Sequence, residues 1–176
     1  MSSSPNRLGQ VAMELWQRLK DVSATLVAAG VVTFLLCQPH LGFGVMVELL
    51  VLVPWTLASI WLMVRQPETR TTQGLKIGVW MLSVAVVALV HYRLANETRA
   101  NAQAVVDAVL AYHEVQGAYP ANAEAVGYSP AQLRTLLGMG GYILNDKQPT
   151  LFYASTFMPF ETEHFDFEKR VWTHGY

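Results

Sequence analysis

LKIGVWMLSVAVVALVHYRLANETRANAQAVVDAVLAYHEVQGAYP, residues 75–120, is the stretch that decides the fold of this chain. Its first part, residues 75–92, is an apolar run long enough for a membrane helix. Neither Pro nor Gly occurs from Val79 to Gln116, and the apolar residues that follow the run recur at helical spacing, at Ala102, Val105, Val109 and Tyr112. At ~1.5 Å per residue, about forty residues would form a rod of roughly 60 Å. We therefore expect one helix that leaves the bilayer and becomes the spine of a small domain outside it.

The composition predicts a membrane protein with one small soluble domain. Of the 176 residues, 14% are charged, compared with ~25% in typical soluble domains. The net charge of −1 gives no electrostatic case for nucleic acid. The single cysteine, Cys37, excludes a disulfide within the chain. We expect no small-molecule substrate either, because no catalytic or phosphate-binding motif is present.

Three apolar runs organise the first half of the chain. An amphipathic lead at residues 8–21 precedes expected spans at about 22–38, 41–64 and 75–92. We thus expect a membrane domain over residues 1–92 and an extracytoplasmic domain over 93–176. The loop at residues 38–44 has no Lys or Arg, whereas residues 1–21 and the link at residues 65–76 have three each. The positive-inside rule then places the N-terminus in the cytoplasm and the C-terminal domain in the periplasm of a bacterial inner membrane.

The C-terminal domain is expected to be α+β. Gly117 should end the long helix, and Ser129-Pro130-Ala131-Gln132 is a helix start with a capping box. That short helix should stop at Gly138, and Gly140-Gly141 is expected to be a loop. Two short strands, at residues 142–144 and 150–155, should form a hairpin around residues 145–149. A last strand is expected over residues 164–172, where apolar and polar residues alternate.

One segment resembles the spine helix of type IV pilins and of the pseudopilins of type II secretion. The Ala-rich helix from Arg99 ends in the aromatic Tyr112, and after a short polar run come Gly117-Ala-Tyr119-Pro120. In that family a similar helix ends in an aromatic residue, followed by a polar run and Gly-x-Tyr-Pro. The resemblance covers residues 75–172 and implies a pilin-like head, in which the spine packs on a short antiparallel sheet.

The chain also departs from the family pattern. Before the spine stands Gly74-Leu75-Lys76, without the basic leader and the glutamate of a pilin. The segment at residues 42–51 looks like a processed pilin start, but it lies in the second span and lacks the preceding basic residue. Because such a chain would not be processed, we expect it to stay in the membrane. The resemblance then implies an accessory protein that binds pilin-type subunits, not a filament subunit.

Glu48 is the sharpest candidate for a binding residue. An ionisable side chain within an apolar span is costly, and it usually faces a partner, a cavity or the interior of a helix bundle. Glu48 could instead reach water at the membrane surface. In the head, Phe157, Met158 and Phe160 are either core residues or an exposed binding patch. The scattered histidines show no metal-binding or catalytic spacing, so we expect no metal, no cofactor and no enzyme.

The first functional hypothesis is a non-catalytic inner-membrane accessory protein of a type IV pilus or related secretion system. It would bind pilin or pseudopilin subunits through its head and its spans. An alternative is a membrane-anchored immunity protein that neutralises a toxin acting in the periplasm or in the bilayer. A second alternative is an accessory subunit of an unrelated membrane complex. The sequence does not decide among these partners.

Overall fold

The computed structural model describes residues 7–39, 41–155 and 161–175. The chain divides into two compact units, Met1–Leu89, here called the helical unit, and Val90–Tyr176, here called the head. The helical unit contains α1 (Arg7–Leu36), α2 (Gly44–Arg65), the short η1 (Pro67–Thr69) and the first part of α3. The head contains the rest of α3, followed by η2 (Ala123–Val126), α4 (Pro130–Leu137) and four strands.

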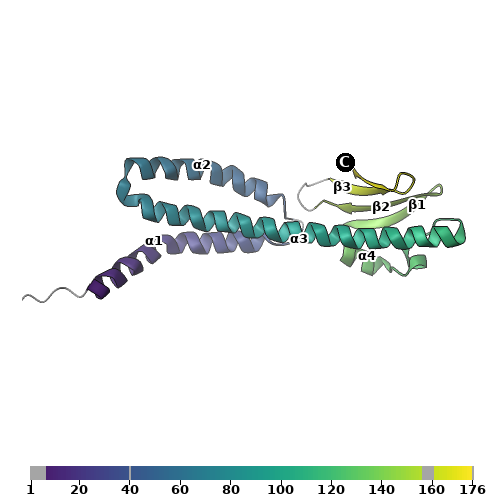
Figure 1. The fold of residues 1–176 in the computed structure, drawn as a ribbon, viewed down its shortest axis with the longest axis horizontal. Helices are drawn as coiled ribbons and strands as arrows, with labels where there is room; N and C mark the ends of the chain where they lie inside the picture. Colours follow the sequence, from purple (N-terminus) through teal and green to yellow (C-terminus); the bar gives the residue numbers. More distant parts are fainter. Residues whose placement is uncertain (1–6, 40, 156–160, 176) are drawn as a thin grey trace, which may run out of the picture. The chain divides into compact units, whose positions relative to one another are not determined.

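Helix α3 (Arg70–Gln116) belongs to both units and is unbroken over 47 residues. At ~1.5 Å per residue this corresponds to a length of roughly 70 Å. The absence of Pro and Gly from Val79 to Gln116 explains why the helix continues, because no residue removes a backbone donor or loosens the backbone. The helix can be followed through both units in Figure 1.

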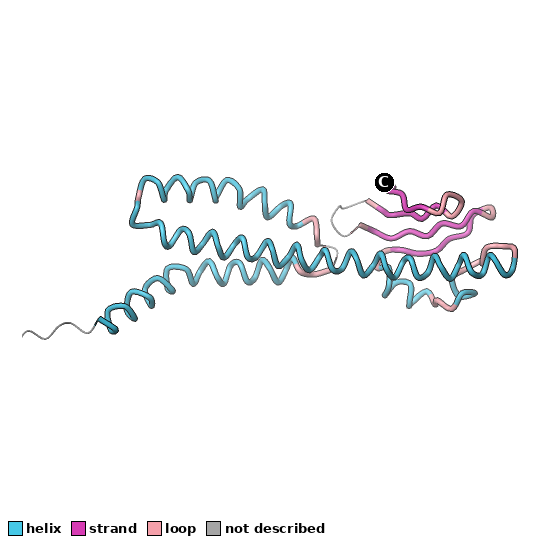
Figure 2. Tube along the Cα trace, in the orientation of Figure 1, coloured by secondary structure: helices cyan, strands magenta, loops and turns pink. Residues whose placement is uncertain are grey.

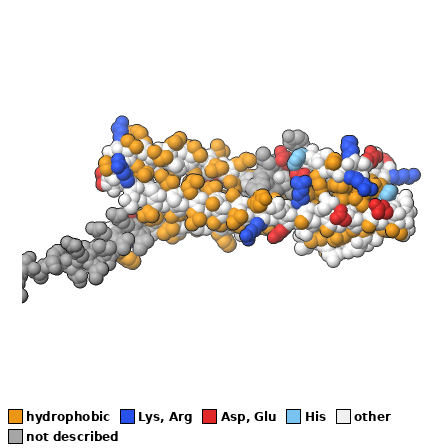
Figure 3. All heavy atoms as spheres, viewed as in Figure 1, with side chains coloured by type: hydrophobic (Ala, Val, Ile, Leu, Met, Phe, Trp, Pro, Cys, Tyr) orange, Lys and Arg blue, Asp and Glu red, His pale blue; other side chains and the backbone are white. Residues whose placement is uncertain are grey.

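Two helices among the described residues are long and apolar enough to cross a membrane, namely Gly44–Arg65 and Pro67–Gln116. Only 17% of the most apolar stretch of each is buried within the protein. In Figure 3 apolar side chains cover most of the visible face of the described helical unit, whereas charged side chains concentrate on the head. All but the last two residues of the expected span at about 22–38 belong to α1, which is not one of these two helices. A third span therefore stays a prediction.

The head has one apolar core between α3, α4 and the sheet. From α3 come the buried Ala102, Val105, Val106 and Val109, from α4 Leu133 and Leu137, and from the strands Leu151, Tyr153 and Phe165. The helical spacing predicted most of the core residues that α3 contributes, although it missed Val106 and included Tyr112, which is half-buried. The head is therefore α+β, with a long helix packed on a small antiparallel sheet, as Figure 2 shows.

The sheet is a meander in the order β1-β2-β3-β4, with every neighbouring pair antiparallel. Its strands are β1 (Gly140–Asn145), β2 (Gln148–Ala154), β3 (Thr162–Asp166) and β4 (Val171–Gly175). The first hairpin is tighter than expected, because Asp146 and Lys147 alone form the turn, with φ of 46° and 72°. Two consecutive positive φ values are typical of the two-residue type I′ turn, whose twist matches that of the strands.

The single strand expected over residues 164–172 is wrong, because a hairpin replaces it. Asp166 Oδ1 accepts hydrogen bonds from the backbone N–H groups of Glu168 (3.0 Å) and Lys169 (2.9 Å). These hydrogen bonds hold the pKa of Asp166 below its ordinary value, and the bond from Lys169 has the largest effect. Arg170 then has φ of 55° and reverses the chain. The alternating pattern hid this turn because Phe167 is buried although it lies outside the strands.

The loop expected at Gly140-Gly141 is also wrong, because both residues belong to β1. Gly140 lies so close to β2 that a Cβ atom there would meet the carbonyl oxygen of Phe152. Glycine is therefore needed for close strand approach and not for a turn. The start of α4 is confirmed: Ser129 Oγ accepts from Gln132 N–H at 3.3 Å, and Gln132 Oε1 accepts from Ser129 N–H at 2.8 Å.

Candidate functional site

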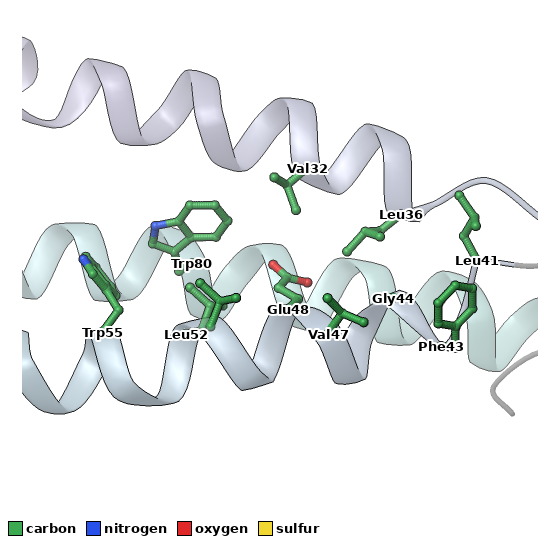
Figure 4. Close-up of a pocket in the computed structure, with 11 residues that line it drawn as sticks. Val32, Leu36, Leu41, Phe43, Gly44, Val47, Glu48, Leu52, Trp55 and Trp80 are labelled. Atoms are coloured by element: carbon green, nitrogen blue, oxygen red, sulfur yellow. The ribbon is translucent and has the colours of Figure 1, made fainter. Parts of the chain in front are cut away.

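Glu48 is the centre of a buried polar cluster in the helical unit. It lies four residues after the first residue of α2 and is only 7% exposed. The N-terminal end of α2 approaches α1 closely, since a Cβ atom on Gly44 would collide with the Leu36 side chain. Figure 4 shows the Glu48 carboxylate directed toward the space between α1 and α2, where Val32 of α1 lies opposite.

Two hydroxyl groups from the other two helices complete the cluster. Ser83 of α3 donates a hydrogen bond to Glu48 Oε1 at 3.2 Å. The Oγ1 atom of Thr33, on α1, lies 2.7 Å from Ser83 Oγ and also 2.7 Å from the carbonyl oxygen of Ala29. Each hydroxyl has a single proton, so when Ser83 donates to Glu48, only Thr33 can donate to Ser83. The bond to Ala29 then competes for the same Thr33 proton.

The second carboxylate oxygen of Glu48 is not paired. Among the described residues, Oε2 is buried and has no hydrogen-bond partner. Most buried polar atoms in proteins do have one, because a buried acceptor without a donor loses its hydration without compensation. The unsatisfied Oε2 therefore marks a place where a donor from outside the described chain would be accepted.

An apolar groove runs past Glu48. It has a volume of about 510 Å³ and is bordered by α1, α2, the α1–α2 connection and Trp80 of α3. Glu48 is the only ionisable side chain among the residues that line it. These residues, most of them drawn in Figure 4, are Val32, Leu36, Leu41, Phe43, Gly44, Val47, Glu48, Val51, Leu52, Trp55 and Trp80. The arrangement suits an apolar ligand or segment with one hydrogen-bonding group.

Chemistry other than binding finds little support at this site. Among the described residues, no three His, Cys, Asp or Glu side chains converge where they could hold a metal ion. The hydroxyls of Ser83 and Thr33 bond to each other, to Glu48 Oε1 and to the Ala29 carbonyl oxygen. The cluster can thus accept or relay a hydrogen bond, and it can connect three helices.

The pilin-like motif in the head has a structural explanation. Gly117 adopts φ of 69°, and its N–H donates to the His113 carbonyl at 2.9 Å, which ends α3. The ring of Tyr119 stacks on His113, with centroids 4.1 Å apart, and meets Phe167 edge-on at 5.7 Å. Together these contacts turn the chain from the end of α3 back onto the sheet.

Pro120 completes this connection. It is buried, and its carbonyl accepts a hydrogen bond from the Tyr142 hydroxyl at 2.9 Å. Burial, with a smaller contribution from Tyr119, raises the pKa of Tyr142 to about 12. The fourth residue of the motif, Tyr112, is half-buried on α3.

The remaining candidates of the head, Phe157, Met158 and Phe160, lie outside the described residues. Sequence reasoning missed Ser83 and Thr33, which are two hydroxyl residues within apolar runs. Such residues often form hydrogen bonds between helices in membranes, so their type was the available signal. Their partners could not be read from the sequence.

Comparisons of the chain with protein-family models, with curated proteins and with solved structures gave no match.

Proposed function

We propose that this chain is a non-catalytic accessory protein of the bacterial inner membrane. It would serve a type IV pilus or a related secretion system by binding pilin-type subunits. In this proposal three helices span the membrane, the N-terminus is cytoplasmic, and the pilin-like head is periplasmic. Binding would be stoichiometric, through the head and through the spans, and would hold subunits before or after they enter a filament.

The observation that carries the proposal is the unbroken α3. One helix contains a candidate membrane span and also provides the α-helical side of the head core. It ends at a left-handed Gly117, followed by Tyr119 and Pro120, which connect it to the sheet. This is the plan that the pilin resemblance implies: a half-membrane spine with an antiparallel sheet packed on its outer half.

Charge distribution supports the proposed orientation. Arg65 is the last residue of α2, Arg70 is the first residue of α3, and Lys76 follows on α3. The guanidinium of Arg65 lies 4.3 Å from the ring centre of the exposed Trp61, an arrangement that suits a membrane surface. Basic residues of short loops favour the cytoplasmic side.

Orientation is tested by cysteine labelling in intact cells, in a Cys37→Ser background. A membrane-impermeant maleimide applied from the periplasmic side should label Lys147→Cys in the head. It should not label Glu68→Cys in the α2–α3 link until the cells are lysed. Both positions are exposed, so access to the reagent is the only difference between them. Labelling of Glu68→Cys in intact cells would overturn the orientation.

The partner is tested by crosslinking in cells that produce pilin-type subunits. The tagged full-length chain is purified in mild detergent, and bound proteins are identified by mass spectrometry. An unrelated tagged protein with three spans, produced at the same level, serves as the control. Enrichment of pilin-type subunits is the expected result. Recovery of a single toxin instead would favour the immunity alternative, and recovery of neither would refute the proposal.

A further inference from the structure

We propose that the groove between α1 and α2 is the docking site for one transmembrane helix of the partner, which presents a hydrogen-bond donor to Glu48 Oε2. The partner helix is apolar and has a hydroxyl, amide or ammonium group at the level of Glu48. This inference rests on the proposed function, because it takes the helix to be that of a pilin-type subunit.

The unpaired oxygen decides the chemistry of the occupant. Ser83 satisfies Oε1, whereas Oε2 is buried and has no partner among the residues described. The other side chains bordering the groove are apolar except for the indole N–H groups of Trp55 and Trp80, and neither is bonded to Glu48 in the structure. A purely apolar occupant would fill the groove and seal Oε2 without a donor, whereas an occupant with a donor satisfies it.

The extent of the groove suits a helix. On α2 it reaches from Gly44 to Trp55, which at ~1.5 Å per residue is about 16 Å, or three helical turns. Side chains at i, i+4, i+7 and i+11 of a partner helix would cover that length. Within the hydrocarbon region a helix also satisfies its own backbone, so it can bring a single polar side chain to this depth.

A lipid fits the same surface less well. An acyl chain would match the apolar walls, but it has no donor for Oε2. Lipid head groups have donors, yet they lie at the membrane surface, whereas the groove continues about 10 Å beyond Glu48, toward Trp55. A groove with apolar side chains and one buried acceptor, Glu48 Oε2, thus favours a protein helix as the occupant.

The test places a photo-crosslinking amino acid at single positions of α2 in the full-length chain. Val47 and Val51 line the groove and are 53% and 67% exposed. Leu50 is 75% exposed on the same helix but does not line the groove, so it is the matched control. Each variant is irradiated in cells that produce a pilin-type subunit, and the crosslinked peptides and lipids are identified by mass spectrometry.

We expect adducts with the span of the subunit at Val47 and Val51 but not at Leu50. In the Val47 background, Glu48→Leu should lower the adduct yield roughly tenfold or more, the loss expected for a hydrogen bond to a charged group. Glu48→Gln retains the shape and can still accept from Ser83, but it places an amide donor at the Oε2 position. The yield should therefore fall if the partner group is an ammonium, which only donates, and persist if it is a hydroxyl or an amide, which can also accept. Expression and the protease pattern of the unirradiated protein should stay unchanged.

Four results would overturn the inference: lipid adducts alone, equal adducts at Leu50, adducts with a second copy of this chain, or a yield independent of Glu48. If pilin-type subunits still co-purify in any of these cases, the proposed function stands and only the groove assignment fails. If the Glu48-dependent adducts map instead to the span of a different membrane protein, the groove assignment stands and the proposed function fails.

Discussion

Replacing Gly117 by alanine should destabilise the head. Gly117 has φ of 69°, which places it in the left-handed region, and an added Cβ atom would meet nothing within 4 Å. The cost is therefore one of backbone conformation and not of packing. An L-residue in this conformation costs about 1–2 kcal/mol, more than alanine gains by restricting the unfolded chain. The net loss is about 1 kcal/mol, so the ratio of folded to unfolded heads should fall roughly fivefold.

Two further variants separate this explanation from others. Gly117→Asn should lose less stability than Gly117→Ala, because asparagine tolerates the left-handed region better. Gly141→Ala makes the same chemical change in β1, where an added Cβ atom also meets nothing within 4 Å and φ is not positive. It should not lower the stability of the head, and restriction of the unfolded chain should raise it by about 0.4–1 kcal/mol.

The assay is hydrogen exchange followed by mass spectrometry on the full-length protein in detergent. Peptides from β2 and β3 report the opening of the head core, because Leu151 and Phe165 lie within it. In Gly117→Ala their exchange should accelerate by the same factor of roughly five. Wild-type exchange in Gly117→Ala, or equal acceleration in Gly117→Asn, would refute the argument that the left-handed conformation demands glycine here.

Two other predictions concern hydrogen bonds. Tyr142→Phe removes the bond to the Pro120 carbonyl and should cost about 1 kcal/mol of head stability; the variant should also lose a tyrosine that ionises near pH 12 in an alkaline absorbance titration. The raised pKa of Tyr142, about 12 against 10.0, means that its contribution is fully present below pH 10 and is lost as the pH rises through about 12. An unchanged titration in the variant would contradict this assignment. Ser83→Ala removes the donor to Glu48 Oε1, so neither carboxylate oxygen then has a donor. The change should lower the stability of the helical unit by about 1–3 kcal/mol, measured by thermal unfolding in detergent. The double variant with Glu48→Leu should lose less than the sum of the single changes, and strict additivity would disprove the coupling.

Much of the fold could be predicted from residues close together in the chain. The continuity of α3 follows from the absence of Pro and Gly, and the capping box of α4 needs only Ser129 and Gln132. The first hairpin was also predicted, although its turn is shorter than expected. The turn after Asp166 was missed because Phe165 and Phe167 are both buried, so the period of two continues through the turn.

The candidate site was predicted only in part. Glu48 stands out in the sequence because an ionisable residue in an apolar run is costly. Its partners do not stand out, since Ser83 is 35 positions away from Glu48, and Thr33 is 50 positions away from Ser83. Serine and threonine often satisfy themselves within their own helix, so their type alone does not predict a contact between helices.

The sequence by itself determined where α3 ends, where α4 begins and ends, which segments are apolar enough for a membrane, and why Gly117 ends the spine. These features depend on hydrogen bonds and periodicity within a few residues. Only the tertiary structure decided that α1, α2 and α3 bring Thr33, Glu48 and Ser83 together, and that Glu48, with its unpaired Oε2, lines an apolar groove. The physical reason is that such contacts depend on the rotation and separation of packed helices, which hydrophobic pattern restricts to a face but does not fix to single atoms.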